Sequence, residues 1–322
     1  MAQITLTQRY EIEALVKIGF NKTAIADKVG FHVSTIGREI KRCRKGYYDA
    51  DTAHSKYLAN RKNNREPYKR TPEMEQVIRK FLIDNDFSPE QIAGRCKEEA
   101  TPMISVDGIY QFIYSVPELA NHLRISKGKR KKRKSNSKNG SKIPDRKPIH
   151  IRPTEADNRS EFGHIELDVV VGTKEKSNVL VTAVCRRSRY TLIGIALSKS
   201  DKDVLKALED MASRSLIPWK TVTCDNGKEF ACHKELEASV GCEAYFADPY
   251  ASWQRGTNEN TNGLIRQYFP KGKSMDNIKM NSVLQVEETL NNRPRKKLNY
   301  WTPIEYIHGE RKNLITINKT CI

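Results

Sequence analysis

The sequence lacks any long hydrophobic run. None of its 322 residues belongs to a stretch approaching the roughly 18 uninterrupted apolar side chains that a membrane-spanning helix needs. The first 20 residues already carry Arg9, Glu11, Glu13 and Lys17 at helical spacing. This pattern argues against a membrane protein, so we expect an intracellular, cytoplasmic protein without a membrane partner.

Paired cysteines are also absent. The seven cysteines are an odd number, lie far apart and include no Cys-x-x-Cys pair. A disulfide framework is therefore not indicated, and we expect reduced thiols, several of them packed in a core. The histidines and cysteines of the front half likewise lack the paired spacing of a zinc module.

Acidic residues are scarce in the front half. Residues 1–150 carry 31 Lys and Arg against 17 Asp and Glu, whereas residues 151–322 carry 26 against 22. The whole chain has a net charge of +18, of which +14 lies in the first part and +4 in the second. Such an asymmetry indicates a polyanionic partner, and nucleic acid is favoured because no amphipathic membrane anchor is present.

Residues 126–150 predict a flexible basic linker. Within residues 126–147, 11 of 22 side chains are basic and one is acidic, and only Ile143 is a sizeable apolar side chain. A run of this composition cannot bury a core, so it separates an N-terminal helical region from the rest of the chain. We expect its densest part to follow the DNA backbone without reading sequence. That part consists of Lys129, Arg130, Lys131, Lys132, Arg133 and Lys134.

Residues 1–60 predict a helix-turn-helix domain. Thr7 is expected to cap its first helix, and Gly30 to end its second. The expected buried side of the third helix is Val33, Ile36 and Ile40, and its outer side is Ser34, Thr35, Arg38, Lys41 and Arg42. A tight connection followed by a helix that presents hydroxyl and guanidinium groups is typical of a unit that docks in the major groove of DNA.

Residues 61–125 predict a second, helix-turn-helix-like helical domain. Thr71-Pro72 is a capped helix start, Ser88 opens a capping box, and a third helix is expected near residues 105–114. The last of these helices carries few basic residues, so a helical bundle without DNA contact is an equal alternative.

Residues 151–322 predict an α/β catalytic domain with a C-terminal helical extension. Residues 164–172, 179–186 and 190–197 are β-rich runs separated by short turns. A helix over residues 201–213 and two further strands follow. The order β-β-β-α-β-α-β-α is that of a ribonuclease-H-like fold, the fold of the retroviral integrase superfamily, so the fold class is multidomain, all-α followed by α/β.

Three acidic residues stand where this fold can bring them together. Asp168 lies inside an otherwise apolar strand, Asp225 ends the fourth strand, and Glu259 lies near the start of a helix. A carboxylate in the first position needs a partner, and a metal ion is the best one. Three carboxylates from three elements suit Mg²⁺ or Mn²⁺, which two-metal sites use for in-line phosphoryl transfer. Taken singly, each has an ordinary explanation: a salt bridge of Asp168 to Arg186 or Arg187, a turn at Asp225, and the N-terminal preference of Glu259.

Three runs carry a distinctive pattern: residues 223–230 (TCDNGKEF), 249–272 (PYASWQRGTNENTNGLIRQYFPKG) and 290–295 (LNNRPR). These runs resemble transposases of the insertion-sequence-thirty family of bacterial mobile elements, and the similarity extends to the first helix-turn-helix. Phe162, Gly37 and Gln254 depart from the family pattern, and the last leaves a local salt bridge in doubt.

The resemblance implies that Asp168, Asp225 and Glu259 form the DDE triad of a Mg²⁺-dependent polynucleotidyl transferase, in which Mn²⁺ can substitute. It also implies that Arg266 is the basic residue one heptad after the glutamate, where it shares a helix face with Glu259 and can grip DNA phosphate. The implied partners are double-stranded DNA, as terminal inverted repeats and as target, and further copies of the chain in a synaptic complex at the nucleoid.

Two other functions remain open as hypotheses. A transposase-derived DNA-binding regulator would bind sites without cutting, but intact Asp168, Asp225 and Glu259 argue against it. An RNA-directed ribonuclease H shares the fold, but the helical DNA-reading units would then have no purpose. A retroviral-type integrase is disfavoured by the missing zinc module.

Overall fold

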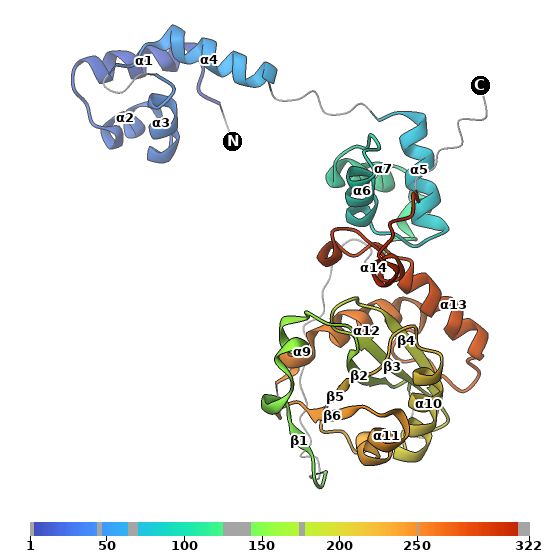
Figure 1. Ribbon diagram of the computed structural model, residues 1–322. Helices are drawn as coiled ribbons and strands as arrows, with labels where there is room; N and C mark the ends of the chain where they lie inside the picture. Colours follow the sequence, from blue (N-terminus) through green and yellow to red (C-terminus); the bar gives the residue numbers. More distant parts are fainter. Residues whose placement is uncertain are drawn as a thin grey trace. The chain divides into compact units, whose positions relative to one another are not determined.

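The computed structural model describes residues 3–43, 47–63, 70–124, 143–173, 178–249 and 251–314. The chain divides into two compact units, Met1–Lys69 and Arg70–Ile322 (Figure 1). The first unit ends later than the expected boundary at residue 60, because a fourth helix completes its core. The basic run at residues 129–134 lies outside the described residues. No helix in the described ranges is long and apolar enough to cross a membrane.

The first unit is a small helical domain. Its elements are α1 (Leu6–Lys17), α2 (Lys22–Val29), α3 (Val33–Ile40) and α4 (Ala50–Asn63). The first helix begins earlier than expected, because Thr5 and Gln8 form a capping box and Thr7 lies inside the first turn. Gly30 ends α2 as expected, in the left-handed conformation with φ 75° that favours glycine.

The middle of α3 packs in the core of this unit. Ile36 is fully buried with Ile12 and Ile25, and Ile40 packs at its margin. Val33 is exposed, so its expected place on the buried side is wrong. It lies in the first turn of α3, directly after the His32 cap, where the helix extends beyond the core.

The second unit opens with a helical layer. Its elements are α5 (Pro72–Ile83), α6 (Pro89–Glu98), α7 (Val106–Ser115) and α8 (Pro117–Ala120). The expected caps are confirmed, since Thr71 and Ser88 accept hydrogen bonds at the starts of α5 and α6. These helices enclose their own apolar core, which includes Ile78, Phe81 and Ile113.

A six-stranded sheet lies among the helices of the C-terminal part of the second unit (Figure 1). Its strands are β1 (Lys147–Pro148), β2 (His164–Val170), β3 (Val179–Cys185), β4 (Thr191–Ala196), β5 (Thr221–Cys224) and β6 (Glu243–Phe246). The strand order is β1-β6-β5-β2-β3-β4, with β2, β3 and β4 antiparallel and β2, β5, β6 and β1 parallel. The expected meander and parallel remainder of a ribonuclease-H-like fold are confirmed.

The expected linker extends too far toward the C-terminus. Ile143 is buried in the main core, and Lys147 and Pro148 pair with Tyr245 and Phe246 as an edge strand. Two buried isoleucines, Ile143 and Ile149, and the two strand residues attach residues 143–150 to the sheet domain. Too few apolar side chains mark this strand for the sequence to reveal it.

Helices cover both faces of the sheet. The remaining elements are η1 (Ile149–Ile151), α9 (Thr154–Asn158), α10 (Asp201–Ser213), η2 (Lys228–Phe230), α11 (His233–Val240), η3 (Ser252–Arg255), α12 (Gly256–Tyr268), α13 (Met280–Asn291), η4 (Lys296–Leu298) and α14 (Pro303–His308). One face packs against α10 and α11. The other packs against α12 and α13. The candidate site lies on the second face.

The C-terminal segment ties the helical layer to the sheet domain. A Cβ on Gly94 of α6 would lie 2.1 Å from the Tyr300 ring, so only glycine permits this close approach. Next to it, the Arg95 guanidinium donates to both carboxylate oxygens of Glu305 at 2.8 and 2.6 Å. Arg95 also donates to Glu99 and to the Tyr300 carbonyl. The two layers are thus joined through a buried ion pair.

Candidate active site

Alternation along β2 places two carboxylates on the face that α12 covers. Ile165 and Leu167 point into the core beneath α10, so Glu166 and Asp168 point to the opposite side. There the main-chain N–H of Asn258 donates to Glu166 at 3.0 Å, and Asn262 Nδ2 donates to Asp168 at 2.8 Å. Glu166 and Asp168 therefore both accept hydrogen bonds from α12.

Asp168 is mostly buried but reaches solvent, with 23% of its side chain exposed. Its Oδ1 accepts a hydrogen bond from the main-chain N–H of Val169 at 2.8 Å. Burial raises the pKa of Asp168, Arg255 opposes this shift, and the negative charge of Asp225 adds to it. The carboxylate is thus held in a place where a further cation is favourable.

Asp225 lies beside Asp168 because their strands are parallel neighbours. Glu166 pairs with Thr223, and each aspartate follows two residues later on its own strand. The main-chain N–H of Gly227 donates to Asp225 Oδ1 at 3.0 Å, which fixes the turn that the sequence predicts. The Asp225 side chain is 36% exposed. The two carboxylates therefore meet near the carboxyl ends of the central strands β2 and β5.

A guanidinium group lies between the two carboxylates. Arg255 Nη2 is 3.1 Å from Asp225 Oδ2, and its Nη1 is 3.8 Å from Asp168 Oδ1. Nη1 also donates to the Leu167 carbonyl at 2.8 Å. The residue lies in η3, directly before α12, and the sequence motif contains it without revealing this role. The alternative explanation of Asp168, a salt bridge to Arg186 or Arg187, is not borne out, because among the described residues Asp168 lies nearest to Arg255 and Arg186 is paired with Glu166.

Glu259 lies in the first turn of α12, four residues after Arg255 and three before Asn262. This spacing places it on the helix face that carries those two residues. Its side chain is exposed. Among the described residues, no three or more His, Cys, Asp or Glu side chains form a group able to hold a metal ion. The structure thus brings Asp168 and Asp225 together and places Glu259 on the adjoining helix face.

Arg266 lies on the same face of α12, as its heptad spacing predicts. Its Nη2 donates to the Val171 carbonyl at 2.8 Å, and its Nη1 donates to the Phe269 carbonyl at 3.4 Å. The guanidinium is therefore anchored on the chain after β2, and here it holds main-chain carbonyls. A grip on DNA phosphate stays a prediction.

Glu166 is a positioning residue that sequence reasoning missed. It is fully buried and accepts a hydrogen bond from Arg186 Nη1 at 2.6 Å, while its other oxygen caps α12. Arg186 is thus paired with Glu166, and Arg187 stacks on the Phe162 ring. The signal in the sequence is the alternation Glu166-Leu167-Asp168, which places both carboxylates on one face of the strand.

In the first unit, α3 presents the polar residues expected to meet DNA. Ser34, Arg38 and Lys41 are exposed and Thr35 is partly exposed. Arg42 is held inward, because its Nε donates to the buried Glu39 at 2.8 Å. The expected position of Arg42 on the outer side of α3 is therefore corrected, because this ion pair turns its side chain toward Glu39.

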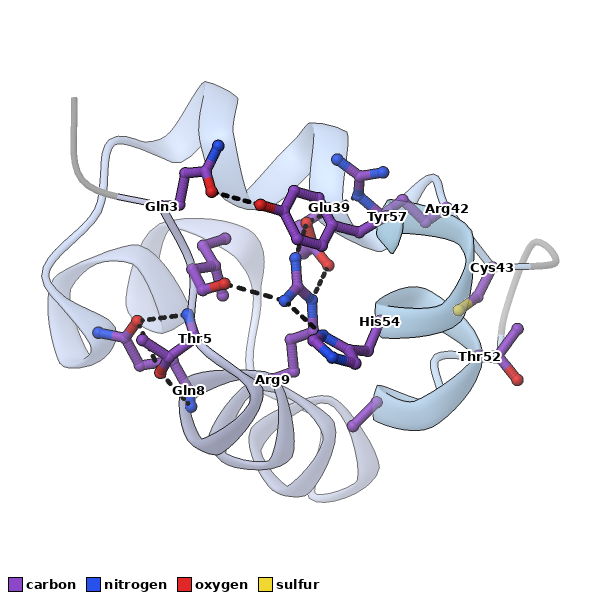
Figure 2. A network of polar contacts seen from close by, with 12 residues as sticks. Gln3, Thr5, Gln8, Arg9, Glu39, Arg42, Cys43, Thr52, His54 and Tyr57 are labelled. Atoms are coloured by element: carbon purple, nitrogen blue, oxygen red, sulfur yellow. Dashed lines mark hydrogen bonds and ion pairs between the residues drawn. The ribbon is translucent and has the colours of Figure 1, made fainter. Parts of the chain in front are cut away.

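The same carboxylate fixes α3 against the rest of its unit. Figure 2 shows Arg9 of α1 between Glu39 of α3 and His54 of α4. Arg9 Nε donates to Glu39 Oε1 at 2.7 Å, and Arg9 also donates to the Ile4 carbonyl at 2.9 Å. The Tyr57 ring lies 4.8 Å from the Arg9 guanidinium. The outward face of α3 is therefore held at a defined rotation.

Comparison with known proteins found a domain family that matches the first unit and relatives that match almost the whole chain. Residues 2–43 match the family model of a helix-turn-helix domain. The transposase for insertion sequence element IS4351 of Bacteroides fragilis is 39% identical, over 94% of each chain. The transposase InsI for insertion sequence element IS30A of Escherichia coli is 38% identical, over 95% of this chain and 84% of its own. The transposase for insertion sequence element IS1086 of Cupriavidus metallidurans is 33% identical, over 95% and 94%. With relatives this similar along almost its whole length, the chain belongs to the IS30 family of insertion-sequence transposases.

Proposed function

We propose that the protein is a DNA transposase that binds the terminal inverted repeats of its insertion sequence and catalyses metal-dependent DNA strand cleavage and strand transfer. The observation that carries this proposal is the pair Asp168 and Asp225, which lie side by side near the carboxyl ends of β2 and β5 and share the Arg255 guanidinium. Glu259 is the third proposed member, on the helix that packs over Asp168.

The donor set fits a hard divalent cation. Carboxylate oxygens are the ligands that Mg²⁺ and Mn²⁺ prefer, and the two aspartates share a single guanidinium as their counter-charge. We propose that Asp168, Asp225 and Glu259 hold Mg²⁺, for which Mn²⁺ can substitute. When bound, the ions supply activation of the attacking oxygen and stabilisation of the leaving oxygen in phosphoryl transfer.

The surrounding residues orient these carboxylates. Asn262 holds one oxygen of Asp168, and Thr182 Oγ1 lies 3.4 Å from Asn262 Oδ1. Glu166 fixes the first turn of α12 through the Asn258 N–H, and so limits how Glu259 can move relative to β2. Rigid support of this kind reduces the reorganisation that a reaction requires.

The first unit is the proposed reader of DNA sequence. Ser34, Thr35, Arg38 and Lys41 lie on the outward side of α3, which has the length and polarity to enter a major groove. The basic run at residues 129–134 is proposed to add affinity through phosphates alone. Cutting two element ends together calls for at least two active sites, so we propose a homo-oligomer in the synaptic complex.

The test is direct. The protein is incubated with Mg²⁺ and labelled ends of the mobile element that encodes it, and nicked and joined products are separated on a denaturing gel. We expect cleavage at the element ends and their transfer to target DNA. End binding without any cleavage would instead identify a transposase-derived DNA-binding regulator.

A further inference from the structure

A cavity of about 600 Å³ lies on the side of α12 away from β2, between the helical layer and the sheet domain. Arg255, Asn262 and Arg266 turn toward β2, whereas Gly256, Asn260 and Gln267 line this cavity. Its other walls come from the start of α6 and from the segment after α13. One helix therefore has the candidate carboxylates on one side and the cavity on the other.

The lining of this cavity is strongly basic. It includes seven Lys and Arg side chains but only two carboxylates, Asp86 and Glu90. Both carboxylates are engaged, since Asp86 lies 3.6 Å from Arg293 and Glu90 lies 2.6 Å from Lys296. Most of the positive charge is thus left without an acidic counterpart.

The central cations are four arginines. Arg159 and Arg189 lie at the end of α9 and in the β3–β4 turn, and Arg293 and Arg295 follow α13. Within the described part of the chain, no carboxylate forms an ion pair with Arg159, Arg189 or Arg295. Their partners are neutral, with Arg189 donating to Thr257 Oγ1 at 2.8 Å and Arg295 to the Leu290 carbonyl at 2.7 Å.

Burial and mutual repulsion both act on this cluster. Burial, followed by the charge of Arg159, lowers the pKa of Arg189 to about 10. Burial, followed by the charges of Arg293 and Arg189, lowers the pKa of Arg295 to about 9. Arg293 is 3% exposed, and its Nε is buried without a hydrogen-bond partner. Arg159, Arg189 and Arg295 are partly buried and lack a carboxylate partner, so the arrangement favours an anionic ligand.

The chemistry of the donors indicates the class of anion. The planar fork of a guanidinium group can donate to two oxygens of one tetrahedral phosphate, and several such groups around one cavity suit a chain of phosphodiesters. We propose that this arginine pocket, defined by Arg159, Arg189, Arg293 and Arg295, binds backbone phosphates of DNA. The proposal rests on the proposed function, and it assigns a DNA contact to the side of α12 that does not carry the carboxylates.

The experiment compares full-length variants in their affinity for a short labelled duplex of arbitrary sequence, over a range of salt concentrations. The test variant combines Arg189→Gln with Arg295→Gln. The control combines Lys202→Gln with Lys206→Gln, which removes equal charge from exposed positions on α10, on the other face of the sheet. The charge-retaining variant combines Arg189→Lys with Arg295→Lys.

We expect the test variant to flatten the slope of log affinity against log salt by about 0.9 per lost phosphate contact, hence by up to about 1.8. The control pair and the lysine pair should keep the wild-type slope. Circular dichroism melts of each variant confirm that it is folded before its slope is compared. If the test pair melts below the assay temperature, the single variant Arg189→Gln replaces it, with an expected change of about 0.9.

The outcomes separate the two proposals. If no form binds DNA, the proposed function fails. If every form binds with the same salt slope, the arginine pocket fails as a DNA contact while the proposed function stands. Phosphorus NMR with inorganic phosphate distinguishes the source of the anion. Loss of phosphate binding in the test variant with an unchanged salt slope would make the pocket a site for free phosphate and overturn the proposal.

Discussion

Two clusters of the second unit have the same charge composition but different surroundings. Arg95 meets Glu305 and Glu99, and Arg255 meets Asp168 and Asp225, so in each cluster one guanidinium serves two carboxylates. Arg95 and Glu305 are 1% and 2% exposed, whereas Arg255, Asp168 and Asp225 are 14%, 23% and 36% exposed. The first cluster is closed to water and the second is open.

This difference separates a structural cluster from a candidate active site. In the closed cluster, the Thr302 and Lys312 N–H groups also donate to Glu305, so its oxygens are satisfied by the protein. In the open cluster, the carboxylates retain access to solvent and hence to an exchangeable cation. The two clusters have the same charge composition, and they differ in how far they are buried and in how many hydrogen bonds the protein supplies to their carboxylates.

The largest effect is expected from neutralising the open cluster. Asp168→Asn, Asp225→Asn or Glu259→Gln should each abolish cleavage and joining while leaving end binding nearly intact, because only the proposed metal charge is lost. Gel assays of cleavage and of end binding, made on the same preparations, measure both. A variant that cuts at the normal rate removes that residue from the site.

Breaking the closed cluster should act on stability instead. Arg95→Met leaves two buried carboxylates without their cation, which should lower the free energy of unfolding by about 3 to 5 kcal/mol. Urea denaturation followed by circular dichroism measures the change. The matched variant in the open cluster, Arg255→Gln, should change stability by less than about 1 kcal/mol, because its carboxylates reach water. Equal losses in both variants would contradict the distinction.

The closed cluster also makes stability depend on pH. Burial raises the pKa of Glu305, but the hydrogen bonds from Arg95, Thr302 and Lys312 outweigh it and leave that pKa lowered. A lowered carboxyl pKa stabilises the fold above its unfolded value, and this contribution is lost as pH falls through the folded value. Unfolding free energy should therefore fall on acidification below the ordinary glutamate range. A wild-type profile flat through that range would contradict this assignment.

The architecture was predictable from sequence wherever periodicity is strong. The antiparallel meander of three strands, the parallel strands that follow it and the caps at Thr71 and Ser88 follow from local patterns and are confirmed. Strand β1 was not predictable, because two residues in a basic run carry no alternation. Val33 was misplaced because helical spacing does not show where the neighbouring helices end.

The acidic residues of the candidate site could be predicted from the sequence, but the side chains that contact them could not. Asp168 stands out because it interrupts an apolar strand, and Asp225 because it directly follows one. The two strands are parallel neighbours, so their carboxyl ends lie together. Arg255 could not be chosen from sequence among the many arginines of the chain. Its role depends on the turn of η3, which aims the side chain at both aspartates. Long-range geometry of this kind leaves no local pattern.

A smaller effect is expected on DNA recognition in the first unit. Arg38 is exposed on α3, while Arg42 is tied to Glu39. Arg38→Ala should weaken binding to element ends by about 1 to 3 kcal/mol if its guanidinium reads a base edge in bidentate fashion. Fluorescence anisotropy with end and arbitrary duplexes measures the difference. An equal loss on both duplexes would make Arg38 a phosphate contact.

The smallest effect is expected from Arg255, in the absence of DNA. Its guanidinium lies where it competes with a divalent cation for Asp168 and Asp225. Partly exposed ion pairs contribute up to about 1 kcal/mol, so Arg255→Gln should tighten Mn²⁺ binding by no more than about fivefold. Calorimetric titration of the full chain measures this affinity, and Arg255→Lys, which keeps the charge, should stay close to wild type. Weaker Mn²⁺ binding in Arg255→Gln would show the opposite relation, in which the arginine assembles the two carboxylates for the metal and does not compete with it.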